Sequence, residues 1–468
     1  MRFGRAALLV CGAAMLAGGD LRATDEPGSQ ARESYGAPAS AWQAVEAKVA
    51  TQPPGSDSVE KKYLAMRLSA EAYYAAYKGW TAPSPPPLPE GRMRNLAETP
   101  AQPRFALDGK DWPQKPGAAS VCLWEDDKVA AMSFLVWGGV PASLTAAEKL
   151  AKQYEGARFS SSLIVGYIEH PSLHPGVKID QAAPGAWDVD KDAFSQGIHF
   201  MSQSMTWNVD PVFEDGWLGP EWECAESIHQ IDANIPGHKT KVLLKPGAYM
   251  GPFNVSKNWK PVVTQYFVAE VGAPGEGINP ANQIDYFNIE TRGCQKLNPA
   301  QADPTEENGA NPAADNFYNL LNSDPKNPNY KYYRGWVIPS IHILEADTAN
   351  PSSILYGKAL DFFAKHRDDI WSGCVDDVAL YGEERDTATL TTTESTEERI
   401  ALKLTSKMDP SSCDYPLTVK VRLPANWKNA VAMQESKALS LSIVEHEGSH
   451  FALIRAAPDQ GAILLQAK

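Results

Sequence analysis

Long apolar segments, cysteine pairs and basic charge are all scarce in this chain of 468 residues. Beyond the first 23 residues no apolar run is long enough to cross a bilayer, so we predict no membrane span. Asp and Glu number 57 against 43 Lys and Arg, which gives a net charge of −14. A surface of this sign repels phosphate backbones, so nucleic acid is not an expected partner.

Several catalytic and metal-binding motifs are also missing. The six cysteines form no C-x-x-C pair, so a thiolate metal site is not indicated. Neither a G-x-S-x-G elbow nor a Walker loop occurs. For most of the cysteines the favoured interpretation is a buried free thiol. The acidic pairs Asp376-Asp377 and Glu383-Glu384 are predicted to be solvated, because adjacent residues on a helix point apart.

One zinc-protease motif does occur, at the far end of the chain. His446 to His450 read H-E-G-S-H and satisfy H-E-x-x-H, which binds zinc only when it lies on a helix. Strand-like sequences flank the motif, and Gly448 interrupts it. We therefore predict a hairpin turn here rather than a metal site.

The N-terminus predicts export. Arg2 and Arg5 precede the apolar run ALLVCGAAMLAGG, and small residues follow up to Ala23. This is the pattern of a secretory signal peptide, so residues 1–23 are assigned to it and the chain is predicted to be secreted or periplasmic. Residues 24–114 read as a helical, Pro-rich extension with a helix at 58–78 and a spacer at 81–91.

The central part of the chain alternates between strand and helix patterns. An apolar run at 129–139 is followed by a helical segment at 145–156, and a second apolar run at 158–168 precedes a further segment at 186–207. This order is typical of a parallel β/α core, in which chemistry lies at the carboxyl ends of the strands. The pattern continues with a helix at 220–232 and a strand at 262–272. Residues 387–399 read as a polar joint, and the segments that follow alternate with period two, so 387–468 is predicted to be a small antiparallel β domain.

Two motifs in this core resemble those of a known family. Ser133–Gly139 reads S-F-L-V-W-G-G, where NodB-type polysaccharide deacetylases (carbohydrate esterase family 4) carry S-F-T-F-D-D-G. Gly197–Trp207 reads G-I-H-F-M-S-Q-S-M-T-W, where the family carries G-H-E-I-G-S-H-S-M-T-H. The resemblance extends over about residues 115–468, and it implies strands at 238–251 and 333–344 and a helix–strand–helix at 358–385. It implies an α/β fold, with an irregular NodB-type (β/α) barrel over 115–386.

The same resemblance implies that the family's chemistry is impaired in this chain. Family members use the first Asp as a base, and the second Asp with two His to hold a divalent metal such as zinc. Trp137, Gly138, Gln203 and Trp207 stand at these positions, so no metal or other cofactor is expected at the family's site. His342 falls in a late motif (YRGWVIPSIHIL) where the family carries the His that protonates the leaving amine. It is the remaining catalytic candidate.

The replacing residues suggest contact with carbohydrate. Trp137 and Trp207 either stack on sugar rings or plug the former metal site, and the sequence leaves both interpretations open. The predicted carbohydrate-binding set is Trp137, Gln203, Trp207, Lys245, Tyr249 and Trp371.

Three functional hypotheses follow. The first is an impaired family member that binds a polysaccharide or oligosaccharide, with a partner protein as the other expected ligand. The second is an active hydrolase that removes acetyl groups from a polysaccharide or amino sugar (a non-peptide C–N bond). It would either recruit metal ligands from elsewhere, such as His199 or Asp188, or work without metal and use His342 as acid and base. The third is a scaffold protein of the cell envelope.

Overall fold

The computed structural model describes eleven stretches of the chain. The chain divides into two compact units, 1–36 and 37–468, and all described residues belong to the second. The predicted signal peptide, most of the N-terminal extension, Trp207 and Tyr249 lie outside the described stretches. These stretches are residues 74–75, 77–85, 87–97, 111–169, 186–206, 218–246, 259–274, 277–294, 324–327, 333–346 and 353–468.

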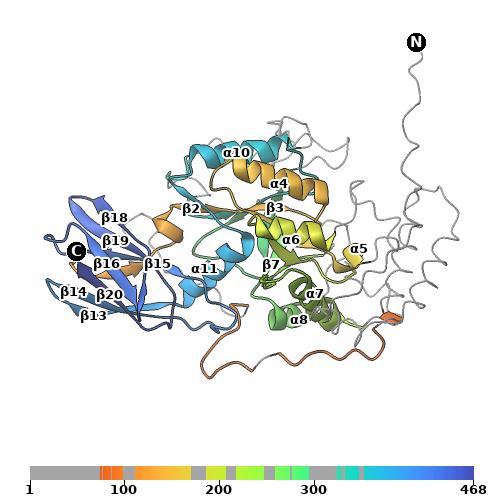
Figure 1. Ribbon diagram of the computed structural model, residues 1–468, viewed down its shortest axis with the longest axis horizontal. Helices are drawn as coiled ribbons and strands as arrows, with labels where there is room; N and C mark the ends of the chain where they lie inside the picture. The colour runs from red at the N-terminus through yellow and green to blue at the C-terminus, as the bar shows by residue number, and fades with distance from the viewer. Residues whose placement is uncertain are drawn as a thin grey trace, which may run out of the picture. The chain divides into compact units, whose positions relative to one another are not determined.

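A closed barrel of seven strands forms the centre of the described structure (Figure 1). Every pair of neighbouring barrel strands is parallel, in the order β11-β3-β4-β5-β6-β7-β9. The predicted α/β class with a parallel barrel is therefore confirmed. The strands are β3 Phe134–Val136, β4 Phe159–Leu163, β5 His199–Ser202, β6 Val242–Leu244, β7 Ala269–Pro274, β9 Ile289–Gly293 and β11 Pro339–Ile341.

A second sheet continues two of the barrel strands at their amino ends. The apolar run at 129–139 is broken at Ser133 into β2 Ala130–Met132 and β3. The buried Ser133 hydroxyl accepts a hydrogen bond from Trp336 Nε1 at 3.0 Å. This bond links the break between β2 and β3 to strand β10, which a similar break separates from β11. The sheet order is β12-β2-β10-β8, with β12 Ile370–Ser372, β10 Trp336–Val337 and β8 Ile278–Asn279.

The helices follow the strands, as the alternating pattern predicts. In α4, Leu144, Ala147 and Leu150 are buried at helical spacing. No described helix has the length and apolar content needed to cross a membrane. The helices are α4 Pro141–Gln153, α5 Val165–Glu169, α6 Trp187–Ser195, α7 Pro220–Asn234, α8 Lys260–Tyr266, α10 Ile354–Lys365 and α11 Val375–Thr387, with a 3-10 turn at Glu125–Asp127.

The strand predicted at 262–272 is wrong in its first half. Residues Lys260–Tyr266 form α8, and strand β7 begins only at Ala269. Pro261 in the first turn fixes a helical φ, and the β-branched Val262 and Val263 are buried where α8 packs on α7. Tertiary packing therefore overrides the β preference of these side chains.

The predicted C-terminal β domain consists of two antiparallel sheets. Their orders are β1-β15-β19-β18 and β13-β14-β20-β16-β17. β1 Ala119–Val121 pairs with β15, although its residues fall within the range predicted for the barrel, 115–386. The other strands are β13 Thr389–Ser395, β14 Arg399–Thr405, β15 Leu417–Arg422, β16 Ala430–Gln434, β17 Lys437–Ala438, β18 Leu441–His446, β19 Ser449–Ala456 and β20 Ala462–Ala467. The segment predicted to be a polar joint, 387–399, therefore contains a strand, because β13 pairs antiparallel with β14.

The zinc-protease motif forms the predicted hairpin. His446 ends β18 and pairs with Ser449 at the start of β19. Glu447 and Gly448 form the turn with φ values of 47° and 69°, a left-handed conformation typical of two-residue hairpin loops. The motif is not helical, so its two histidines do not share a helix face.

The part of the N-terminal extension before the predicted spacer packs on helix α7. Tyr74 and Tyr77 contact the buried Trp222 of α7 edge to face, at ring-centroid distances of 5.7 and 5.3 Å. Trp80 Nε1 donates a hydrogen bond to Glu226 on the same helix at 3.2 Å. The extension is therefore anchored immediately before the predicted spacer at 81–91.

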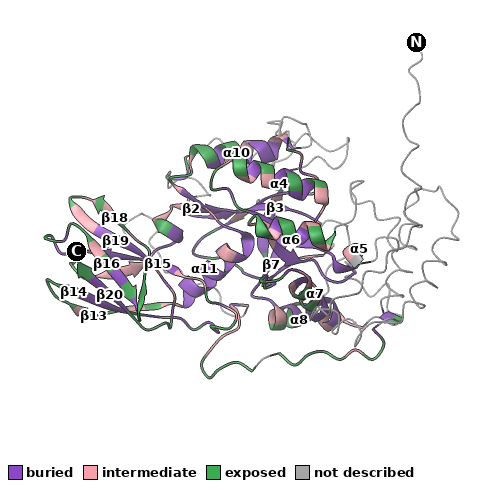
Figure 2. Ribbon diagram, in the orientation of Figure 1, coloured by how far each residue is buried: buried purple, intermediate pink, exposed green. Residues whose placement is uncertain are grey.

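Helix α11 connects the barrel with the C-terminal sheets. All of its residues except Asp377 are buried (Figure 2). Glu383 and Glu384, predicted to be solvated, are 0% and 1% exposed, because this helix has no solvent-facing side. Tyr381 Oη donates to the carbonyl of Cys122, next to β1, at 2.9 Å, and Thr387 Oγ1 hydrogen-bonds Ser406 after β14 at 2.8 Å.

Replacing Gly382 of α11 with alanine is expected to destabilise the chain by about 1–3 kcal/mol. A Cβ at this position would lie 2.3 Å from the hydroxyl oxygen of the buried Tyr286, which donates a hydrogen bond to Asp386. Urea unfolding measures the effect. Gly293→Ala is the matched control, because no atom lies within 4 Å of its added Cβ. Equal stability of the two variants would contradict the prediction.

Candidate functional site

Four predicted site residues directly follow barrel strands and lie at one end of the barrel. Trp137 follows β3, Gln203 follows β5, Lys245 follows β6 and His342 follows β11. Because all seven strands are parallel, their carboxyl ends meet at the same edge. We call these four residues the carboxyl rim. The structure thus brings them to one end of the barrel, as the sequence predicts.

The contacts of the carboxyl rim hold its side chains in place. The rings of Trp137 and His342 lie 4.8 Å apart at an angle of 31°. Ser162 Oγ accepts a hydrogen bond from the Gly138 amide at 3.0 Å and donates one to Gln203 Oε1 at 2.9 Å. Trp137 is only 5% exposed, so little of its indole face is open to a sugar. This burial favours the plug over the stacking platform.

The described part of the carboxyl rim does not fit the divalent metal that the deacetylase family uses. An indole, a glycine and a neutral amide occupy the positions of Trp137, Gly138 and Gln203, and none of these is a good ligand for a divalent ion. The fourth position, Trp207, lies outside the described residues. The described residues at these positions therefore offer no ligand set for a divalent ion.

Asp190 is a buried carboxyl near the carboxyl rim that the sequence analysis did not identify. It lies on α6 with 0% exposure, and neither carboxyl oxygen has a hydrogen-bond partner among the described residues. One of these oxygens is 3.8 Å from where a Cβ on Gly139 would be, in the turn after β3. Burial raises the pKa of Asp190 to about 8. The sequence signal for its burial is its spacing of three from Ala193, which is also buried on this helix. Asp188, which was considered as a recruited metal ligand, is exposed.

A cleft of about 830 Å³ lies at the opposite end of the barrel, where β4 and β5 begin. We call it the amino-end cleft. Trp371 of β12 lines it, so the structure separates Trp371 from the other described members of the predicted carbohydrate-binding set. Its lining residues are Glu125, Lys128, Glu155, Gly156, Arg158, Gly197, His199, Phe363, Arg367, Asp368, Ile370, Trp371, Ser372, Gly373, Cys374, Asp377, Tyr415 and Arg455.

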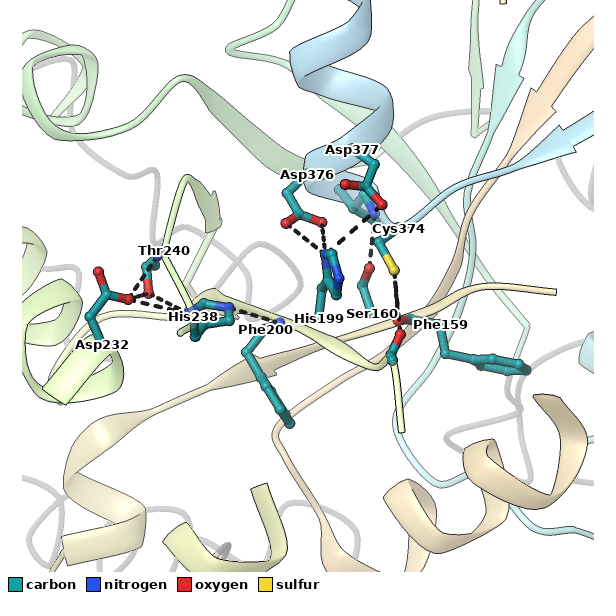
Figure 3. Close-up of polar contacts among 12 residues, drawn as sticks. Phe159, Ser160, His199, Phe200, Asp232, His238, Thr240, Cys374, Asp376 and Asp377 are labelled. Atoms are coloured by element: carbon teal, nitrogen blue, oxygen red, sulfur yellow. Dashed lines mark hydrogen bonds and ion pairs between the residues drawn. The ribbon is translucent and has the colours of Figure 1, made fainter. Parts of the chain in front are cut away.

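The start of α11 forms one wall of the amino-end cleft. The amide of Val375 donates to Ser160 Oγ at 2.8 Å, and the Cys374 thiol donates to the carbonyl of Phe159 at 3.3 Å. Both contacts attach the first turn of α11 to β4. His199, the first residue of β5, lies beside this turn (Figure 3).

His199 and the acidic pair at the start of α11 form an ionic cluster. His199 Nδ1 lies 2.9 Å from Asp376 Oδ2 and 4.0 Å from Asp377 Oδ2 (Figure 3). Burial by itself lowers the pKa of His199, but its hydrogen bonds with Asp376 and Cys374 outweigh burial and raise this pKa to about 12. Burial, followed by the charge of Asp376, raises the pKa of Asp377 to about 7. The prediction that these carboxylates are solvated is therefore wrong, because β5 packs against them.

All five cysteines after the N-terminal segment are buried and free. This confirms the favoured interpretation for Cys122, Cys224, Cys294, Cys374 and Cys413. Burial raises the pKa of the Cys374 thiol, and His199 opposes this rise. Of these five cysteines, Cys374 has its sulfur in a cluster with one histidine and two carboxylates.

Comparison with known proteins identifies one related sequence and several distant structures. No family model matches the chain. A gellan lyase from Bacillus sp. is 28% identical over 394 residues, which cover 81% of this chain and 14% of that protein. The chain thus spans about one-seventh of the length of this relative.

The solved structures resemble the chain only weakly. A Mycobacterium smegmatis protein described as a polysaccharide deacetylase has a TM-score of 0.35 at 11% identity, covering 57% of this chain and 93% of its own. A mutant of BA3943, a CE4-family pseudoenzyme with restored activity, has a TM-score of 0.33 at 9% identity, covering 54% and 68%. The PuuE allantoinase has a TM-score of 0.34 at 13% identity, covering 59% and 96%. Scores this low carry no argument about activity.

Proposed function

We propose that this chain is an exported polysaccharide-binding unit that has lost the hydrolytic chemistry of the deacetylases it resembles. The loss of chemistry is inferred from the carboxyl rim. Trp137 packs against His342 there, in a position where a catalytic barrel needs a base and an open metal site. The sequence relationship with a gellan lyase supports a polysaccharide as the ligand. The signal-peptide pattern in residues 1–23 supports export.

The proposed binding surface is the amino-end cleft. Its volume of about 830 Å³ lies in the range usual for ligand pockets. Tyr415 lines it half-buried and supplies the aromatic surface that sugar C–H groups contact, and the buried ring of Trp371 lies beside it at a centroid distance of 6.2 Å. Arg158 is exposed in the cleft, whereas Arg455 is held by Glu125 at 2.9 Å. Arg158 is therefore the cation best placed to reach a ligand.

Substitution of Arg158 by alanine is expected to weaken polysaccharide binding at least about tenfold, which corresponds to one lost charge-assisted hydrogen bond. The measurement is calorimetric titration of the mature chain with gellan fragments and with chitin oligosaccharides. Arg158 is exposed, so the variant is expected to fold normally. Tyr415→Phe keeps the ring and removes a hydroxyl that donates to Glu125, and it tests whether the ring itself is sufficient.

Matched variants at the carboxyl rim separate the two ends of the barrel. Lys245→Ala and Gln203→Ala should leave the affinity unchanged. Loss of binding in these two variants, together with normal binding by Arg158→Ala, would place the ligand at the carboxyl rim and contradict the proposed surface. Release of acetate or of shortened chains by the wild type would contradict the loss of chemistry. Absence of binding to any glycan would favour the scaffold hypothesis instead.

A further inference from the structure

The described residues contain one convergent set of metal-binding donors. His199 Nδ1, Cys374 Sγ and one carboxylate oxygen each from Asp376 and Asp377 lie within 4.8 Å of one another. The histidine comes from the first residue of β5, and the other three come from the residue before α11 and its first turn. The close-up in Figure 3 shows these side chains lying around the imidazole of His199. Two elements distant in the sequence therefore supply a mixed nitrogen, sulfur and oxygen donor set.

The chemistry of this set selects the kind of ion. Thiolate and imidazole favour zinc and related transition ions, whereas magnesium and calcium take oxygen ligands. Donors bound tetrahedrally to zinc lie about 3.5 Å from one another, given bond lengths of about 2.0–2.3 Å. His199 Nδ1 already lies 2.9 Å from one Asp376 oxygen and 4.0 Å from one Asp377 oxygen. These two separations lie on either side of the tetrahedral spacing, and the four donors, all within 4.8 Å of one another, would reach it by rotation of their side chains.

The surroundings of the cluster give an ion access to the donors and favour a divalent cation there. His199, Cys374 and Asp377 line the amino-end cleft, so a hydrated ion has a route to three of the four donors. Asp376 and Asp377 lie in one helical turn around a single histidine, and a divalent cation neutralises two neighbouring carboxylates better than one imidazolium does. The Cys374 thiol now donates to the carbonyls of Phe159 and Gly197, at 3.3 and 3.7 Å. On binding, it would release its proton to solvent and turn its sulfur toward the ion.

We propose that His199, Cys374, Asp376 and Asp377 bind one zinc-class divalent cation at the amino end of the barrel. This site lies at the opposite end from the position where the deacetylases hold their metal, and it shares no residue with that position. The ion would link the beginning of β5 to the beginning of α11 and thereby stabilise the amino end of the barrel. The proposal does not depend on whether the cleft also binds a polysaccharide.

Metal content and cobalt absorption test the proposal on the full mature chain. After chelation, loading with Zn²⁺ and desalting, the wild type should retain about one equivalent by elemental analysis. With Co²⁺ in place of Zn²⁺, a thiolate-to-cobalt charge-transfer band should appear in the near ultraviolet. Zn²⁺ should also raise the thermal midpoint of the metal-free chain, because it binds only the folded form. Absence of the cobalt band in the wild type would overturn the proposal by itself.

Single substitutions identify the ligands. His199→Gln and Cys374→Ser should each lower zinc affinity at least about 100-fold. Cys374→Ser should also remove the cobalt band. Asp377 is less buried than Cys374, so Asp377→Asn tests the site even if the first two variants fold poorly. The controls are His342→Ala at the carboxyl rim and Cys294→Ser, a buried cysteine outside the cluster, and both should bind as the wild type does. Undiminished metal in folded His199→Gln and Cys374→Ser would show that the cluster is only an ion pair.

Discussion

Replacing Arg385 with methionine is expected to lower the free energy of unfolding by about 3–5 kcal/mol. The Arg385 side chain is fully buried in the last turn of α11. It pairs with Asp386 at 2.9 Å and donates to the carbonyls of Leu123 and Ala281 at 2.8 and 3.0 Å. Its guanidinium also lies over the ring of Trp124, 4.9 Å from the centroid. Methionine keeps most of the volume but leaves a buried carboxylate and two carbonyls without this donor.

Urea unfolding of wild type and variant measures this effect. Arg367→Met is the matched control, because Arg367 forms an exposed ion pair with Glu155 at 3.5 Å, and its loss should cost less than about 1 kcal/mol. The double variant Arg385→Met/Asp386→Asn should recover part of the loss, since it also removes the uncompensated charge. A loss for Arg385→Met as small as that of the control would show that water replaces the guanidinium.

The Asp190→Asn variant is expected to become more stable than the wild type as the pH rises from about 4 to 8. Burial raises the pKa of Asp190 from 3.8 to about 8, so in this window the folded chain holds a proton that the unfolded chain has released. The wild type therefore loses about 1.4 kcal/mol of stability per pH unit through this group. Below pH 4 the carboxyl is neutral in both states, and there the variant should match the wild type.

The measurement is the free energy of unfolding in urea at several pH values, with the difference between variant and wild type plotted against pH. Asp188→Asn is the control, because Asp188 is on the same helix but its side chain is 96% exposed. That variant should show no added slope. Parallel stability curves for Asp190→Asn and wild type would mean that the carboxyl of Asp190 is hydrated or paired in the folded chain.

The sequence was sufficient to locate the carboxyl rim, because this prediction needs only connectivity. In a parallel barrel, a residue that directly follows a strand lies at the carboxyl end whatever the details of packing. Trp137 and His342 were therefore expected at the same end, and they contact each other there. The hairpin at Glu447 and Gly448 was predictable for a similar reason, since turn chemistry is local.

Sequence reasoning failed where distant contacts decided the outcome. Val262 and Val263 favour a strand by themselves, but packing on α7 makes them helical. Glu383 and Glu384 were expected in solvent because they are charged, yet both are buried. The side of a helix that faces solvent depends on its neighbours, and these are not visible in the local pattern.

The amino-end cluster shows this limit most clearly. The sequence by itself showed the alternating pattern of a parallel barrel, and it placed Trp137 and Gly138 where the family it resembles carries a base and a metal-binding Asp. Only the tertiary structure could decide that His199 meets Asp376, because 177 positions separate them in the chain. Periodicity and motif spacing report neighbours within a few residues. The contact between β5 and α11 instead results from how the barrel closes and from the packing of α11, the last helix, at the amino end of the barrel.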